Sequence, residues 1–134
     1  MPITDINLLA VLVAGLLSMV IGFVWYGPLF AKDWMKEVGL KEKDLRKGPG
    51  VGYALTLAGA LIEAYVLAHF IDYAQATTWM DGMVTGLWLW IGFVAYAIGV
   101  NYIFARRSFK LWTIDSGYFL ALLLAQGALL AVWV

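Results

Sequence analysis

The sequence predicts an all-α membrane protein in which four helices cross the bilayer. Of its 134 residues, 63% are hydrophobic and only 13% are charged, against about 45–50% and 25% in soluble domains. A soluble domain of this size could not bury so much apolar surface, because its surface-to-volume ratio is unfavourable. Four stretches each hold the roughly 20 apolar residues that cross the hydrocarbon core. None shows the period-two alternation of a membrane β-strand, so all four are expected to be helices.

The predicted spans cover about residues 7–26, 51–70, 83–104 and 112–134 of a single domain over residues 1–134. The first span is not expected to be a cleaved signal peptide. The residues before it carry no Lys or Arg, and its apolar run continues to Trp25 and Tyr26. Pro28 is expected to end the first helix, because proline cannot donate to the helical hydrogen bonds.

The loop at about residues 28–49 is predicted to contain a short amphipathic helix. Its apolar residues Trp34, Met35 and Val38 recur at helical spacing, opposite charged residues. Such a helix lies on the inner membrane surface and is attracted to anionic lipid. An ordinary solvated loop is the alternative. Residues 47–50, Lys-Gly-Pro-Gly, predict a turn into the second span.

The positive charges predict the orientation. All nine Lys and Arg residues lie in the loops between spans one and two and between spans three and four. The positive-inside rule places both loops in the cytoplasm and both termini outside, which gives two out-in-out hairpins. Nine acidic residues balance the nine basic ones, so no charge excess predicts a nucleic-acid partner; the expected surroundings are membrane lipid. The absence of cysteine excludes disulfides and thiolate metal sites.

Shared motifs indicate an internal duplication of the two hairpins. The matching pairs are Gly-Phe-Val-Trp-Tyr at 22–26 with Gly-Phe-Val-Ala-Tyr at 92–96, Leu-Phe-Ala-Lys at 29–32 with Ile-Phe-Ala-Arg at 103–106, and Gly-Tyr-x-Leu at 52–55 with 117–120. Two out-in-out hairpins would be related as a parallel repeat about an axis normal to the membrane. Chance matching between apolar segments is the alternative.

Glu63 is the strongest candidate site residue. It lies near the middle of the second span, where an acidic side chain costs on the order of 2.5–3.5 kcal/mol. Gly52, Thr56 and Gly59 precede it on the same helix face, at steps of four, three and four. We expect Glu63 to point into the bundle and to hold a proton, because desolvation disfavours the charged form. Two roles stay open: a proton- or cation-binding carboxyl in a transport path, or an acid that joins helices through Thr56, Gln126 or a tyrosine.

A second candidate cluster lies at the start of the fourth span. Asp115 is about one turn inside it, where the helix dipole favours a carboxylate and where Arg106 or Arg107 is within reach. Asn101, at the end of the third span, is expected to bond to the same cluster. We interpret the cluster as a structural clamp, with a ligand site as the alternative.

No motif predicts a catalytic residue, a cofactor or a metal ion. The single histidine, His69, is six residues from Glu63 and therefore on a different face of its helix. The glycines lie inside apolar spans and not after strands, so no phosphate-binding loop is predicted. Most aromatic residues are expected at the two membrane interfaces. Trp88 and Trp90 lie deeper and are interpreted as lipid contacts, with a pocket lining as the alternative.

Several of these residues together resemble the signature of a bacterial family, domain of unknown function 1761 (DUF1761). They are Asn101-Tyr102-Ile103-Phe104, Arg107, Leu111 and Ile114-Asp115-Ser116-Gly117-Tyr118, with Asn7, Trp25, Tyr26, Pro28, Trp34 and Met35 nearer the N-terminus. The resemblance covers nearly the whole chain. Asp115 stands where the family has asparagine, and Phe119 where it often has histidine. The family is uncharacterised, so the resemblance implies a four-helix fold in a bacterial cytoplasmic (inner) membrane and no activity.

Three classes of function are consistent with the sequence. The first is a structural or accessory membrane protein, working as a homo-oligomer or as a subunit of a larger complex. The second is a small transporter or channel subunit that uses Glu63. The third, an enzyme acting on a lipid or a quinone, is least favoured because no nucleophile–base pair is visible.

Overall fold

A computed structural model describes residues 5–45 and 50–133, and every regular element within them is a helix. Four of the described helices are long and apolar enough to cross a membrane: Leu8–Leu29, Gly50–Tyr73, Trp79–Phe104 and Phe109–Val132. The prediction of an all-α fold with four candidate spans is therefore confirmed. The third and fourth helices begin three to four residues earlier than expected. Arg46, Lys47 and the Lys-Gly-Pro-Gly turn lie outside the described residues.

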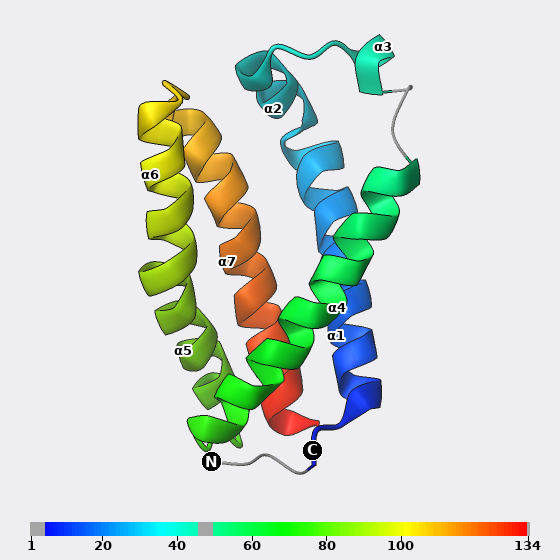
Figure 1. Cartoon of the computed structure of the whole chain (residues 1–134), viewed down its shortest axis with the longest axis vertical. Coiled ribbons are helices and arrows are strands. Elements are labelled where there is room, and N and C mark those ends of the chain that lie inside the picture. The colour runs from blue at the N-terminus through cyan, green and yellow to red at the C-terminus, as the bar shows by residue number, and fades with distance from the viewer. Residues whose placement is uncertain (1–4, 46–49, 134) are drawn as a thin grey trace.

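The four long helices run alternately up and down (Figure 1). In chain order the elements are α1 (Leu8–Val24), η1 (Trp25–Leu29), α2 (Ala31–Val38), α3 (Glu42–Leu45), α4 (Gly50–Tyr73), α5 (Trp79–Leu89), η2 (Trp90–Ala95), α6 (Tyr96–Phe104) and α7 (Phe109–Val132). The helices α2 and α3 and the α6–α7 turn lie at one end of the bundle, called here the α2 end. Both ends of the described chain and the α4–α5 turn lie at the other, called here the terminal end.

Polar side chains satisfy the first backbone N–H groups of three of these helices. The side chain of Asn7 accepts a hydrogen bond from the N–H of Ala10 at 3.0 Å. The hydroxyl of Thr78 accepts from Asp81 at 3.1 Å, and that of Ser108 from Leu111 at 3.0 Å. A helix cannot satisfy these N–H groups internally, so the caps fix where α1, α5 and α7 begin.

Two short π-helical segments interrupt the first and third spans. The first, η1, contains Pro28 and a kink at Gly27, whose φ and ψ are −107° and −105°. The helix therefore breaks at the Gly27–Pro28 step, as the missing proline donor predicts. The second, η2, lies in the middle of the third span and contains no proline. π-Helical turns inside α-helices are frequent at functional sites.

The core is built around α7, which packs against α1, α4 and α5. Close approach of α5 depends on glycine: a Cβ on Gly82 would overlap the backbone carbonyl of Gly127, and one on Gly86 would overlap that of Leu123. The buried residues of α7 include Leu122, Leu123, Gln126, Gly127, Leu130 and Ala131. Gly82 and Gly86 thus form a helix contact face.

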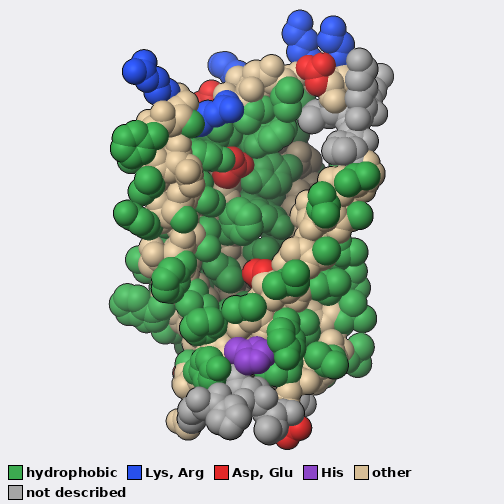
Figure 2. Space-filling model, viewed as in Figure 1, with side chains coloured by type: hydrophobic (Ala, Val, Ile, Leu, Met, Phe, Trp, Pro, Cys, Tyr) green, Lys and Arg blue, Asp and Glu red, His purple; other side chains and the backbone are tan. Residues whose placement is uncertain are grey.

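The fully buried residues of the helix α4 all lie in its second half. Its buried residues are Ala64, Leu67, Ala68 and Ile71. The first half is largely exposed, and a Cβ on Gly59 would meet nothing within 4 Å. No described backbone approaches Gly59, because the first half of α4 leans away from α7 (Figure 1). The space left behind is a crevice, visible as a hollow in the upper half of Figure 2.

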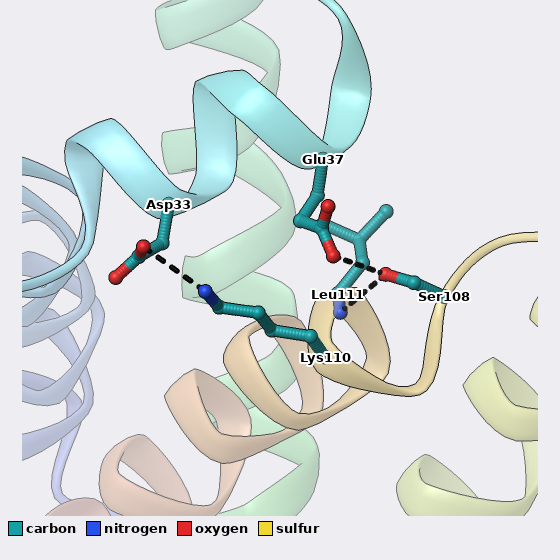
Figure 3. A network of polar contacts seen from close by, with 5 residues as sticks. All are labelled: Asp33, Glu37, Ser108, Lys110 and Leu111. Carbon is teal, nitrogen blue, oxygen red and sulfur yellow. Dashed lines mark hydrogen bonds and ion pairs between the residues drawn. The ribbon is translucent and has the colours of Figure 1, made fainter.

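The predicted helix in the first loop is present as α2, and it is fastened to the start of α7 (Figure 3). Lys110 pairs with Asp33 at 3.1 Å, and the Ser108 hydroxyl donates to the Glu37 carboxylate at 2.7 Å. The helix ends at Gly39, whose φ of +80° suits glycine. The solvated-loop alternative is wrong for residues 31–38. Attraction of α2 to anionic lipid stays a prediction.

Candidate functional site

The carboxyl group of Glu63 lies inside the bundle without a hydrogen-bond partner among the described residues. Both of its oxygens are buried. The side chain beside it is that of Gln126, on α7. Gln126 is fully buried, with 0% of its surface exposed, and its Nε2 donates to the backbone oxygen of Ala14 at 2.8 Å. Its Oε1 is also buried and unpartnered. The polar groups of both side chains therefore lie in the interior of the bundle.

The other expected partners of Glu63 are bonded elsewhere. Thr56 donates to the backbone oxygen of Gly52, one turn earlier on the same helix, at 2.8 Å. Tyr118 donates to the backbone oxygen of Ser18 at 2.9 Å. The expectation of a Thr56–Glu63 bond is therefore wrong, since Thr56 lies two turns away along α4. Of the named candidates, Gln126 is the one whose side chain lies beside the carboxyl without a bond to another residue through its Oε1.

Glu63, Gln126 and Ala14 lie at one level of the bundle, called here the Glu63 layer. A crevice of about 340 Å³ opens on one side of the Glu63 layer. It lies between α1 and the first half of α4, and Tyr118 of α7 reaches into it. Its lining is mostly apolar and aromatic, with hydroxyls from Ser18, Thr56, Tyr26, Tyr53 and Tyr118. Because α4 leans away from α7 here, the crevice lies toward the α2 end.

A second cavity, of about 400 Å³, lies at the terminal end. Its polar lining comes from Asp5, Asn7, Asp72, Gln75 and Thr77. Its apolar wall is formed by residues near the ends of α4 and α7, among them Ala68, Ile71, Leu130 and Ala131. The two cavities therefore differ in character: one is aromatic with hydroxyls, and the other holds carboxylates and amides.

The Glu63 layer lies between the two cavities on each of the three helices that line them. On α4, Glu63 falls between Thr56 of the crevice and Ala68 of the terminal cavity. On α7, Gln126 falls between Tyr118 and Leu130. On α1, the bonded carbonyl of Ala14 falls between Asn7 and Ser18. The buried Glu63 thus lies, along the bundle, between the crevice and the terminal cavity.

Asp115 holds two tyrosines and not an arginine. Its two carboxylate oxygens accept hydrogen bonds from the hydroxyls of Tyr26, at 2.7 Å, and Tyr102, at 2.5 Å. No ion pair joins it to Arg106 or Arg107 within residues 5–45 and 50–133. The expected arginine pairing is wrong, because each carboxylate oxygen of Asp115 accepts a hydrogen bond from a tyrosine of the first or third span. The clamp itself is present, since Asp115 joins three helical segments.

Asn101 and Arg107 stay outside this cluster. The amide of Asn101 donates to the backbone oxygen of Ala97 at 2.9 Å, on its own helix, so its expected bond to the cluster is wrong. Arg107 is exposed and lines a smaller pocket with Tyr102 and Trp112. Neither residue contributes to the interior of the bundle.

Three tryptophans bind α7 to the π-helical segments, a role that sequence reasoning missed. The indole N–H of Trp25 donates to the backbone oxygen of Ile114 at 2.8 Å, and that of Trp90 to Ser116 at 2.7 Å. Trp112 of α7 donates in return to Ala95 at 3.1 Å. Trp88 is 68% exposed on the outer surface, as a lipid contact would be. The available signal was that an indole N–H deep in a span needs an acceptor.

Metal-binding chemistry has no visible site in the described part of the chain. No group of three or more His, Asp or Glu side chains there could hold an ion. His69 is bonded through Nδ1 to the backbone oxygen of Tyr65 at 2.8 Å, and its ring packs edge-on against the Tyr65 ring.

Comparison with known proteins identifies a family. No curated protein and no solved structure matches the chain. One family model matches residues 9–131, nearly all of the described fold, and its description is "Protein of unknown function (DUF1761)". The chain therefore belongs to the DUF1761 family.

Proposed function

We propose that this protein is a small transport or channel subunit that moves a proton or a small cation through Glu63. The observation that carries the proposal is the position of that carboxyl. It is buried, it has no hydrogen-bond partner among the described residues, and it lies between two cavities at opposite ends of the bundle. Ionisable groups inside a membrane are costly and mark ion or proton pathways when they face the interior.

The linings of the two cavities support the same proposal. Asp5 and Asp72 give the terminal cavity a cation-attracting mouth. In the crevice, the hydroxyls of Ser18, Thr56 and three tyrosines are groups that can bind water. The closed section between them would have to open alternately or transiently for passage.

The distribution of charge supports an orientation in a bacterial cytoplasmic membrane. All nine Lys and Arg residues fall, in the sequence, between the first and second spans or around the turn between the third and fourth, and α2, α3 and the α6–α7 turn, which carry the described ones, lie at the α2 end. In Figure 2 the basic side chains of the visible face gather at that end. We propose that the α2 end is cytoplasmic and the terminal end external, so that the chain forms two out-in-out hairpins.

We also propose that the two hairpins are a parallel duplication. Both π-helical segments begin at a tryptophan that donates to α7, at carbonyls only two residues apart. The matching motifs at 22–26 and 92–96 align Trp25 with Ala95, but the tryptophan of η2 that donates to α7 is Trp90. The two π-helical segments therefore resemble each other as segments and not residue by residue. Four helices enclose little volume, so we propose that the working unit is a homo-oligomer or part of a larger membrane complex.

A structural or accessory role is the second candidate. It is favoured by the hydrogen bonds that fasten α7 to the first and third spans, through three indoles and Asp115. In that role Glu63 would only join helices. Glu63→Leu would then cost about 1 kcal/mol of stability, the typical value of an interhelical bond in a membrane.

Proton flux into sealed proteoliposomes tests the proposal. The purified protein is reconstituted with a pH-sensitive dye inside the vesicles, and a potassium diffusion potential drives uptake. We expect the wild type to acidify the lumen faster than empty vesicles, and Glu63→Gln to reduce the rate to that of empty vesicles. Gln keeps the size of the side chain but cannot release a proton.

The matched control is Asp81→Asn, which removes an acid from the exposed first turn of α5 and should leave the flux unchanged. An equal flux in the wild type and in Glu63→Gln would contradict the proposal. A wild-type rate no faster than that of empty vesicles would also contradict the proposal. Either result would favour the structural role.

A further inference from the structure

We propose that the groove between α6 and the start of α7 binds an anionic phospholipid, with the phosphate at Arg107 and an acyl chain along the groove. This site is separate from Glu63 and does not depend on the proposed transport. The groove has a volume of about 320 Å³, and its lining comes from α6, the α6–α7 turn and the first turns of α7. Because that turn lies at the α2 end, the groove reaches the end of the two spans that form it.

The walls of the groove are apolar and aromatic. Ile103 of α6 and Phe109 of α7 are 72% and 78% exposed, so both lie on the outer surface of the bundle. The Phe109 ring stacks on that of Trp112, with 5.4 Å between the ring centroids. On the α6 side, a Cβ on Gly99 would lie only 3.3 Å from Nε1 of Trp112, so a larger residue there would fill the groove. Such walls suit a hydrocarbon chain.

Arg107 is the one charged side chain in the described lining of the groove. The turn fixes its position, because the N–H of Arg107 donates to the backbone oxygen of Tyr102 at 2.9 Å and that of Arg106 donates to Ile103 at 3.2 Å. These two bonds close the C-terminus of α6. The exposed side chain of Arg107 therefore starts at the end of the groove that faces away from the middle of the spans.

The charges around the groove favour an anion. The helix α6 and the α6–α7 turn contain no acidic residue, and both carboxylate oxygens of Asp115 accept hydrogen bonds from tyrosines. One carboxylate touches the lining: Glu37 of α2 accepts a hydrogen bond from Ser108 (Figure 3). Arg106 and Arg107 together exceed this single negative charge, so the turn keeps a net positive charge.

A phospholipid matches both halves of the groove. Arginine binds phosphate oxygens through a planar fork of N–H groups, and basic pockets between membrane helices bind anionic headgroups. A soluble phosphate compound would meet the guanidinium but leave the aromatic walls without a partner. A phospholipid with a neutral headgroup would fill the walls, but its positive amine would lie near the arginine. An anionic headgroup avoids that repulsion.

Native mass spectrometry of the purified protein in detergent tests the proposal. The protein is titrated with dioleoyl phosphatidylglycerol or with dioleoyl phosphatidylcholine, which share their acyl chains and differ in headgroup charge. We expect one phosphatidylglycerol molecule to bind more tightly than phosphatidylcholine. Arg107→Gln should weaken its binding about fivefold, equivalent to the roughly 1 kcal/mol that a basic residue contributes at an anionic membrane surface. Arg106→Gln, the matched control, removes the same charge from outside the lining and should change binding by less than about twofold.

Gly99→Leu tests the place of the acyl chain. The added side chain would fill the groove beside Trp112, so binding of both lipids should weaken. Circular dichroism shows whether this variant folds, and if it does not, the two arginine variants still decide the proposal.

Four results would overturn the proposal. The first is phosphatidylglycerol that binds no more tightly than phosphatidylcholine, and the second is an equal loss in Arg106→Gln and Arg107→Gln, which would indicate diffuse surface charge. The third is displacement of the lipid by inorganic phosphate, which would indicate a phosphate site without a place for the chain. The fourth is a folded Gly99→Leu variant that binds phosphatidylglycerol as the wild type does.

Discussion

Replacing Gly82 with leucine is expected to separate α5 from α7 and to lower the stability of the bundle by about 3 kcal/mol, at the upper end of the usual cost of overpacking. Even the first added carbon, Cβ, would overlap the backbone carbonyl of Gly127 and crowd the Cβ of Ala131. A backbone carbonyl cannot rotate away as a side chain can, so the two helices must move apart. Unfolding in mild detergent, followed by circular dichroism, measures the loss.

Gly59→Leu is the matched control for this substitution. Gly59 also lies inside an apolar helix, but a Cβ there would meet nothing within 4 Å. Its replacement should change stability by less than about 1 kcal/mol, since only the difference in helix propensity remains. Equal losses for the two variants would mean that the close contact between Gly82 and Gly127 does not exist.

Removing the Asp115 carboxylate is expected to have the second largest effect. Asp115→Leu leaves the hydroxyls of Tyr26 and Tyr102 without their acceptor, and we expect a loss of about 2 kcal/mol. Asp115→Asn keeps an acceptor oxygen and should cost less than half as much. The same detergent unfolding experiment measures both, with Lys110→Ala as the control for an exposed ion pair of little value.

The tyrosine partners can be tested separately by a double-mutant cycle. If Asp115 acts through Tyr102, Tyr102→Phe should cost little once Asp115 has been replaced by leucine, because their bond is already gone. Fully additive losses would show that the two side chains do not interact.

The helices and the burial of Glu63 could be predicted because lipid leaves few alternatives. Within hydrocarbon a backbone must satisfy its own hydrogen bonds, so each apolar run of sufficient length becomes a helix. An acid near the middle of such a run must face the interior. The break at Gly27–Pro28 and the contact face at Gly82 and Gly86 follow equally local rules.

The partners of the polar groups could not be predicted because they depend on helix tilt and rotation. Arg107 and Tyr102 are both close to Asp115 along the sequence, and only the packing of α6 on α7 decides that the tyrosine reaches it. The lean of α4, which opens the crevice beside Thr56, leaves its fully buried residues in the second half of the helix. Trp25 and Trp90 were expected at an interface or against lipid, because their carbonyl acceptors belong to a helix distant in sequence.

Cysteine accessibility measures most directly whether the Glu63 layer separates two cavities that open to opposite sides of the membrane. The chain has no cysteine, so single variants can be read without background. Thr56→Cys probes the crevice, Thr77→Cys the terminal cavity, and Ala64→Cys the closed layer, where Ala64 is 0% exposed. A small membrane-impermeant thiol reagent is added to intact cells and to inverted vesicles.

We predict that Thr77→Cys reacts only from the outside, Thr56→Cys only from the cytoplasmic side, and Ala64→Cys from neither. Reaction of Thr56→Cys and Thr77→Cys from the same side, or reaction of Ala64→Cys as fast as the other two, would contradict a closed layer between two opposed cavities.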